Sequence, residues 1–232
     1  VFYMKMKIKQ LMACALAVCL AASLSACAVK PAAPSTSGNA EKALKIGVIQ
    51  FATHPSLDNC YKGFKEGLAA NGFEEGKNIK IDFQNAQGDM SNSDLIAKNM
   101  VAAKCDMIVA IATPTAMSAY SAAKDSGIPV LFIAVSDPVA AGLVQSLDAP
   151  NTGCTGTSDT LNLDGQVKLI RAFLPEAKTI GVLYTVSEPN SVSHLEKLKA
   201  IASAAGFEVV AVGINSASEV AAGAATLVAK KV

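Results

Sequence analysis

From Leu44 onward, short runs rich in isoleucine and valine alternate with segments of helical periodicity. Strands and helices that alternate in this way build parallel sheets with helices packed against them. The runs predict strands at 44–50, 79–83, 107–112, 130–134, 179–184 and 207–212. The first expected helix has an apolar face formed by positions 57, 61, 64 and 68. The other expected helices cover 94–103, 115–124, 164–173, 193–205 and 218–229. The sequence therefore predicts an α/β fold.

The second half of this series repeats the first. The motif Ile-Gly-Val begins at Ile46 and at Ile180, and in both places a Gly-Phe pair follows 26 positions after the isoleucine. Such spacing also arises by coincidence between unrelated βαβ units, but we interpret it as two similar lobes, 44–157 and 158–232. In this register, the counterpart of the strand that follows Cys105 would begin beyond the last residue. We therefore expect the second lobe to be a truncated part of a longer protein.

The first 26 residues resemble the signal peptide of a bacterial lipoprotein. Three lysines precede an apolar run over 11–24, which is too short to span a hydrocarbon core of about 30 Å. The run ends in Leu24-Ser25-Ala26-Cys27, which resembles a lipobox, and this resemblance implies cleavage before Cys27 and lipidation of its thiol. The alternative is an ordinary secretory signal with an incidental Cys27. Residues 27–43 contain prolines and serines with little apolar surface and are expected to form a flexible tether.

Charge and cysteine content exclude several classes of protein. The chain has 20 basic and 19 acidic residues. Removing residues 1–26, with three lysines and no acidic residue, leaves 17 against 19 and a net charge of −2, so no basic field remains for nucleic acid. Beyond Cys27, the cysteines are Cys60, Cys105 and Cys154. Their odd number and wide spacing favour small buried side chains over a disulfide framework or a metal site.

Polar residues follow several of the expected strands, at the edge where parallel sheets bind their ligands. Thr113 can cap a helix that has Pro114 at its first position and whose free N–H groups attract a carboxylate, although an ordinary capped helix explains both residues equally well. Asp137 and Asp159 can each meet a substrate ammonium or simply form an Asx turn. The stretch 188–191 follows the first strand of the second lobe and can provide another N-cap.

No GxGxxG, GxxxxGK[ST], GxSxG or HExxH motif occurs in the chain. Nucleotide-binding, phosphate-loop, hydrolase and zinc-protease functions therefore lose their usual support. A nucleophile would have only His54 or His194 as its base, and a histidine before a proline, as at position 54, is typical of a turn. The sequence thus favours a binding protein without metal or cofactor over an enzyme.

Residues 44–230 resemble the solute-binding proteins of bacterial ABC importers, whose characterised members include receptors for tryptophan and other aromatic amino acids. The resemblance is carried by IGVIQ at 46–50, HPSLD at 54–58, NAQGD at 85–89, AIATP at 110–114, SDPVAAGLV at 136–144 and GTSD at 156–159. It implies the type I periplasmic binding protein fold, with two Rossmann-like lobes that close about a hinge on a solute. By position, it implies a pocket formed by Gln50, Thr113, Thr115, Ser136, Asp137, Ser158, Asp159, Asn190 and Ser191.

The leading hypothesis is an amino-acid receptor, because the strand-end loops offer sites for both an anion and a cation. Such a receptor is expected to be a monomer that delivers its solute to the permease and ATPase subunits of an ABC importer. It would act on the extracytoplasmic face of a bacterial membrane, anchored through Cys27. A nucleoside or sugar receptor, a lipid-anchored enzyme and a sensor that reports to a kinase are the alternatives, since one fold supports many functions.

Overall fold

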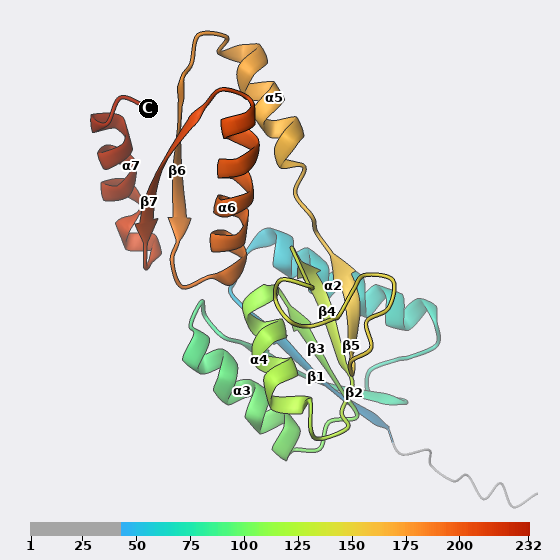
Figure 1. Ribbon diagram of the computed structural model, residues 1–232. Coiled ribbons are helices and arrows are strands. Elements are labelled where there is room, and N and C mark those ends of the chain that lie inside the picture. Colours follow the sequence, from blue (N-terminus) through green and yellow to red (C-terminus); the bar gives the residue numbers. More distant parts are fainter. Residues whose placement is uncertain (1–42) are drawn as a thin grey trace, which may run out of the picture. The chain divides into compact units, whose positions relative to one another are not determined.

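The computed structural model describes residues 43–232. The expected signal peptide, the expected acylation site at Cys27 and all of the expected tether except its last residue lie outside this range. The described residues form an α/β structure (Figure 1). Its elements are β1 (Leu44–Gln50), α2 (Pro55–Ala70), β2 (Ile79–Asn85), α3 (Met90–Ala102), β3 (Met107–Ile111), α4 (Thr113–Ala123), β4 (Val130–Val135), β5 (Cys154–Ser158), α5 (Leu163–Phe173), β6 (Thr179–Thr185), α6 (Pro189–Ala204), β7 (Glu208–Ile214), a short 3₁₀ helix (Ala217–Glu219) and α7 (Val220–Ala229).

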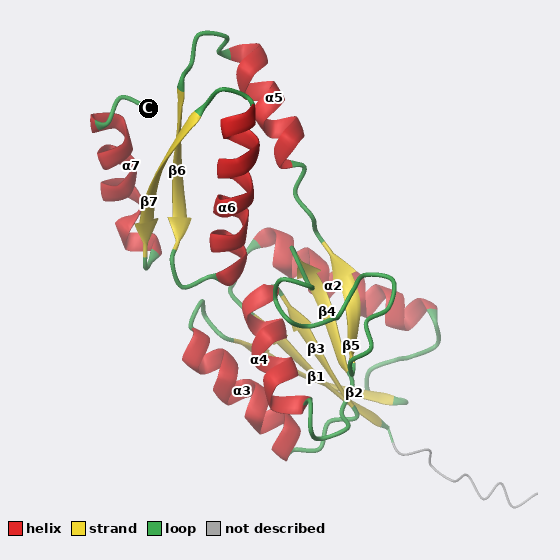
Figure 2. Cartoon of the chain, in the orientation of Figure 1, coloured by secondary structure: helices red, strands yellow, loops and turns green. Residues whose placement is uncertain are grey.

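The first five strands form one parallel sheet in the order β2-β1-β3-β4-β5. Side chains of the central strand β3 alternate between the two faces of the sheet. Ile108 and Ala110 join the core under α3 and α4, whereas Val109 and Ile111 join the core under α2. Helices thus cover both faces (Figure 2). Burial on both sides explains why the central strands β3 and β4 are uninterrupted apolar runs in the sequence.

β6 and β7 form a second, two-stranded parallel sheet. On one face, α5 and α6 pack against it through a core that includes Val167, Ala202 and Phe207. On the other face lies α7, where Gly223 approaches Leu183 so closely that a methyl group at position 223 would collide with it. Both sheets therefore have the parallel strands and helical layers of an α/β protein, and the predicted fold class is confirmed.

The repeated Gly-Phe pairs end two helices with the same turn. Gly72 and Gly206 follow α2 and α6 with φ angles of 82° and 75°, a left-handed conformation that favours glycine. The N–H of Phe73 donates to the carbonyl of Leu68, and the N–H of Phe207 donates to the carbonyl of Ala202. In both cases the acceptor lies five residues earlier. The sequence repeat therefore corresponds to a repeated helix C-terminus.

β5 is the strand that the hydrophobic pattern does not predict. Its sequence, Cys-Thr-Gly-Thr-Ser, contains one buried side chain, that of Cys154. The strand lies at the edge of the sheet and pairs with β4 alone, so it needs little apolar surface. Its partner β4 changes register between Phe132 and Val135, and Ala134 within this irregularity has a φ of 56°.

The three cysteines in the described part of the chain have free thiols. Cys105 and Cys154 are buried and Cys60 is half-buried. Burial raises the pKa of each thiol, that of Cys154 to about 11, so all three stay protonated at neutral pH. Within residues 43–232, no group of three or more histidine, cysteine or acidic side chains is placed to hold a metal ion. No helix in the same range has the length and apolar character needed to cross a membrane.

Candidate functional site

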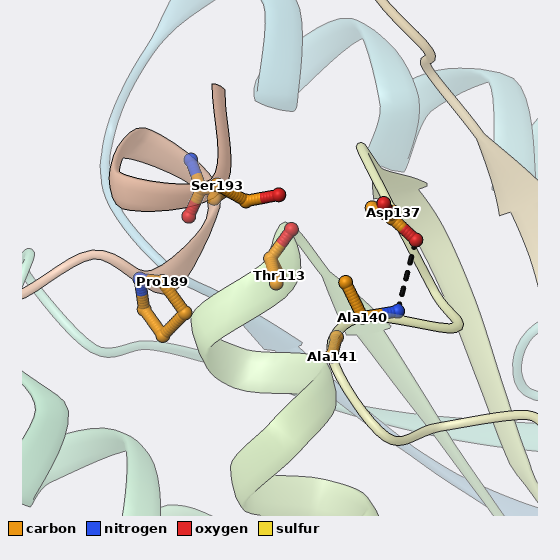
Figure 3. A pocket seen from close by; sticks show the side chains of 7 residues that line it. Thr113, Asp137, Ala140, Ala141, Pro189 and Ser193 are labelled. Carbon is orange, nitrogen blue, oxygen red and sulfur yellow. Dashed lines mark hydrogen bonds between the residues drawn. The ribbon is translucent and has the colours of Figure 1, made fainter. Parts of the chain in front are cut away.

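A pocket opens at the carboxyl ends of β3, β4 and β6. Three segments form it: the start of α4, the loop after β4 and the start of α6 (Figure 3). Its lining residues are Thr113, Asp137, Ala140, Ala141, Pro189, Asn190 and Ser193. The cavity between them has a volume of about 40 Å³. This is well below the range of about 300–1,000 Å³ for small-molecule sites, so it has room for a small polar group rather than for a whole solute.

Asp137 places a carboxylate at this pocket. Its Oδ1 accepts a hydrogen bond of 2.9 Å from the N–H of Ala140, and its carbonyl oxygen accepts one from the N–H of Ala141. Its Oδ2 forms an ion pair with the ammonium of Lys197 on α6. The Ala140 N–H and the Lys197 ammonium both lower the pKa of Asp137, so the carboxylate is ionised at neutral pH. Asp137 therefore shapes the loop and also brings negative charge to the pocket.

The first turn of α4 reaches the pocket without a side-chain cap. The N-cap residue is Ala112, so the expectation that Thr113 caps the helix is wrong: Thr113 and Pro114 are its first two residues. Ala112 has φ 89° and ψ 155°, a conformation that is normally restricted to glycine and costs about 1–3 kcal/mol. Because no side chain satisfies the first turn, its backbone N–H groups and the helix dipole are available to an anion.

The first turn of α6 has the same property and adds an oxygen acceptor. Its N-cap residue, Glu188, makes no capping hydrogen bond, and Pro189 occupies the first turn. The Nδ2 of Asn190 donates to the Glu188 carboxylate at 3.4 Å, but its Oδ1 is buried and has no hydrogen-bond partner. A buried acceptor without a donor is costly, so this oxygen is available to a further hydrogen-bond donor. The pocket thus combines two uncapped helix N-termini with the oxygens of Asp137 and Asn190.

His194 lies near the charges of Lys197, Asp137 and Asp159, and it should make the stability of the folded protein depend on pH. Burial and the charge of Lys197 lower its pKa, and the carboxylates of Asp159 and Asp137 oppose this effect. A histidine with a lowered pKa binds its proton less readily in the folded protein than in the unfolded chain. Stability should therefore fall as the pH drops through about 6.5, the ordinary histidine pKa, and towards the lower folded value.

The expected result is that lowering the pH from about 7.5 to about 5.5 reduces the melting temperature of the wild type more than that of His194→Gln. Melting curves recorded by circular dichroism at several pH values provide the measurement. If the melting temperatures of the two proteins fell equally with pH, His194 would not titrate differently in the folded and unfolded states. His54→Gln is the control, because the exposed His54 only caps α2, where its Nδ1 accepts from the Ser56 N–H.

Three of the nine residues implied by the family resemblance line this pocket: Thr113, Asp137 and Asn190. Thr115 does not line it, because its buried hydroxyl donates to the carbonyls of Ile111 and Ala112 at 2.7 and 3.0 Å. These two bonds support the strained connection between β3 and α4. The role of Thr115 in the structure is therefore to hold the backbone that carries the site.

Gln50 is buried at the end of β1 and has an incomplete set of hydrogen bonds. Its Nε2 donates to the Ala52 carbonyl and to the Asp58 carboxylate, whereas its Oε1 has no partner. Gln50 resembles Asn190 in this respect, although it does not line the same pocket. It remains a predicted site residue with an acceptor available to a donor.

The other four predicted residues lie elsewhere around the strand ends. Ser136 and Ser191 are half-buried next to lining residues but are not part of the lining. Ser158 lines a separate pocket between β5 and the loop after β4. Asp159 is exposed. Its negative charge adds to the effect of burial in raising the pKa of Cys60, and it partly offsets the lowering of the pKa of His194.

Two residues at the site, Ser193 and Lys197, were not among the residues predicted from the sequence. Ser193 lines the pocket, but the predicted helix begins at this residue, whereas α6 begins four residues earlier at Pro189. Proline is frequent in the first helical turn, so Pro189 was the signal for the earlier start. Lys197 had no such signal, because its partner Asp137 is 60 residues away in the sequence.

A pocket of backbone N–H groups and oxygen acceptors at the carboxyl ends of parallel strands is where α/β proteins usually bind small molecules. The chain belongs to the family of ABC transporter substrate-binding proteins, whose family model matches residues 45–232. This membership confirms the resemblance seen in the sequence and the expectation of a binding protein rather than an enzyme.

Characterised relatives support the same assignment. A tyrosine-binding protein of Clostridioides difficile is 46% identical over 192 residues, which are 83% of this chain and 55% of the relative. The structure of an ABC domain in complex with L-Trp from Streptococcus pneumoniae is 43% identical with a TM-score of 0.76, and the match covers 82% of this chain and 63% of that one.

A further relative has been solved without ligand. The open structure of a substrate-binding protein with adhesive properties from Clostridium difficile is 49% identical with a TM-score of 0.58. The match covers 81% of this chain and 63% of that one. The chain therefore spans between about half and two thirds of the length of the relatives that it matches.

Proposed function

We propose that the chain captures an aromatic amino acid in the pocket formed by the starts of α4 and α6 and the loop after β4. The observation that carries this proposal is the pairing of opposite polarities in one small space. An α-carboxylate fits the two uncapped helix N-termini, and an α-ammonium fits the oxygens of Asp137 and Asn190. A free amino acid carries both groups, whereas sugars and nucleosides carry neither.

The aromatic side chain of the solute is inferred from two relatives above 40% identity. One is described as a tyrosine-binding protein, and the other was solved in complex with L-Trp. Within the pocket of this chain, Ala140, Ala141 and Pro189 supply apolar surface beside the polar groups. The cavity of about 40 Å³ is too small for a bulky ring, so we propose that the ring lies against this apolar surface beside the cavity.

The same proposal includes the location and partners of the protein. The lipobox-like sequence that ends at Cys27 supports a lipoprotein on the extracytoplasmic face of a bacterial membrane, and the proposal takes it to act as a monomer. Family membership supports delivery of the solute to the permease and ATPase of an ABC importer. Mass spectrometry of the membrane fraction tests the anchor, because acylation should add a lipid mass to a peptide that begins with Cys27.

Binding can be measured with the solute itself as the probe, because the chain contains no tryptophan. We expect the emission of added L-tryptophan to shift and saturate when the protein, expressed from its full sequence and purified in detergent, is titrated. L-tyrosine should compete for the same site. At about 100 times its dissociation constant, a solute that binds only the folded state adds about 2.7 kcal/mol of stability, which thermal unfolding detects.

The panel for this experiment is L-tryptophan, L-tyrosine, L-leucine, a nucleoside and a sugar. Stabilisation by leucine alone would keep the amino-acid site but contradict the aromatic specificity. Stabilisation by only the nucleoside or the sugar would contradict the proposed function. Turnover of any bound solute would favour an enzyme instead.

A further inference from the structure

The carboxylate of Asp137 is already fully engaged within the chain. One oxygen accepts from the backbone of Ala140, and the other is paired with the ammonium of Lys197. Lys197 lies on α6, one turn after Ser193, which lines the pocket. Its ammonium therefore stands where the proposed function places the ammonium of the solute.

We propose that Lys197 is a tethered competitor of the solute: its ammonium occupies Asp137 in the unliganded protein and leaves when the ammonium of an amino acid binds. This inference rests on the proposed function and names the residue that sets affinity at the same site. The Lys197 ammonium and the solute ammonium are both positive and would lie beside the same Oδ2 of Asp137, so their repulsion favours the departure of one when the other binds. The exchange replaces one ion pair by another and keeps Asp137 neutralised.

The side chain of Lys197 can leave at little cost. It is 49% exposed, whereas the Asp137 side chain is 23% exposed. A lysine on a flexible stem regains hydration and rotational freedom when it moves into water. An ion pair of this kind typically changes an equilibrium constant by roughly 1.5- to 5-fold. The lysine thus weakens solute binding to a limited extent rather than blocking it.

The test compares Lys197→Met with Lys199→Met. Both variants remove one positive charge from α6 and keep a long side chain, but Lys199 pairs with Glu196 and not with Asp137. Because the competitor is gone, Lys197→Met should bind L-tryptophan about 2- to 5-fold more tightly than the wild type. Lys199→Met should bind it as the wild type does. Indole-3-propionate, which lacks the ammonium, should gain no affinity in either variant.

Weaker or unchanged tryptophan binding by Lys197→Met would overturn the inference, since it would make Lys197 a solute contact or a bystander. A second measurement needs no solute. Acetylation of lysines, followed by peptide mass spectrometry, should be faster at Lys197 in Asp137→Asn than in the wild type, with Lys199 unchanged as the internal control. Equal rates at Lys197 would contradict the ion pair itself. Failure of every variant to bind tryptophan would contradict the proposed function, whatever the acetylation rates show.

Discussion

Replacing Asp137 by asparagine should weaken L-tryptophan binding by about 10- to 100-fold. The expected loss follows from the charge-assisted hydrogen bond between a carboxylate and an ammonium, which is worth about 1.5–3 kcal/mol. Asparagine retains an oxygen that can accept from the Ala140 N–H, so the loop after β4 should keep its shape. The negative charge is lost, and with it both the partner of the solute ammonium and the ion pair with Lys197. Titration of L-tryptophan fluorescence gives the dissociation constants.

Asp125→Asn is the matched control for this variant, because Asp125 is an exposed aspartate that does not line the pocket. It should bind L-tryptophan like the wild type. Indole-3-propionate separates the loss of charge from general damage to the site, since its affinity should not fall in Asp137→Asn. An unchanged tryptophan affinity in Asp137→Asn would show that the solute ammonium binds elsewhere.

The largest expected loss of stability follows truncation of Ile108 in the central strand of the larger sheet. Ile108 is 0% exposed and lies between β1 and β4 in the core under α3 and α4. Ile108→Ala removes buried carbon atoms and leaves a cavity that the tightly packed side chains of α3 and α4 cannot readily fill. The expected cost is about 2–5 kcal/mol. Urea unfolding monitored by circular dichroism measures it.

Leu95→Ala is the control, because Leu95 is 57% exposed on α3 and should change stability by no more than about 0.5 kcal/mol. A similar small effect in Ile108→Ala would mean that the core around β3 repacks easily. Ile108→Val provides an intermediate case, with an expected cost of about 0.5–1.5 kcal/mol.

Local signals in the sequence were sufficient for most of the fold. The run from Leu44 to Gln50 predicts β1 with its observed bounds, because its stretch from Ile46 to Ile49 is buried on both faces and carries no polar side chain. β5 has no such signal: as an edge strand it buries only Cys154, and its pairing with β4 is specified by the sheet rather than by its own residues. Tertiary context therefore decides the elements that bury little surface.

The site was predictable where it depends on position along a strand. Thr113, Asp137 and Asn190 were accessible to prediction because each follows a strand whose carboxyl end reaches the ligand edge of a parallel sheet. Lys197 was not, because nothing in the local sequence of α6 indicates a partner in a loop 60 residues earlier. The unusual backbone of Ala112 was equally hidden, since alanine rarely adopts a positive φ.

The division of the site between distant segments fixes the order in which it can form. Every strand of the five-stranded sheet precedes residue 159, so a nascent chain that emerges N-terminus first contains Thr113 and Asp137 before it contains α6. At about 5–20 residues per second, roughly 2–8 s of synthesis separate the end of β5 from Lys197. The pocket can therefore be completed only late in synthesis, after the larger sheet has had time to assemble.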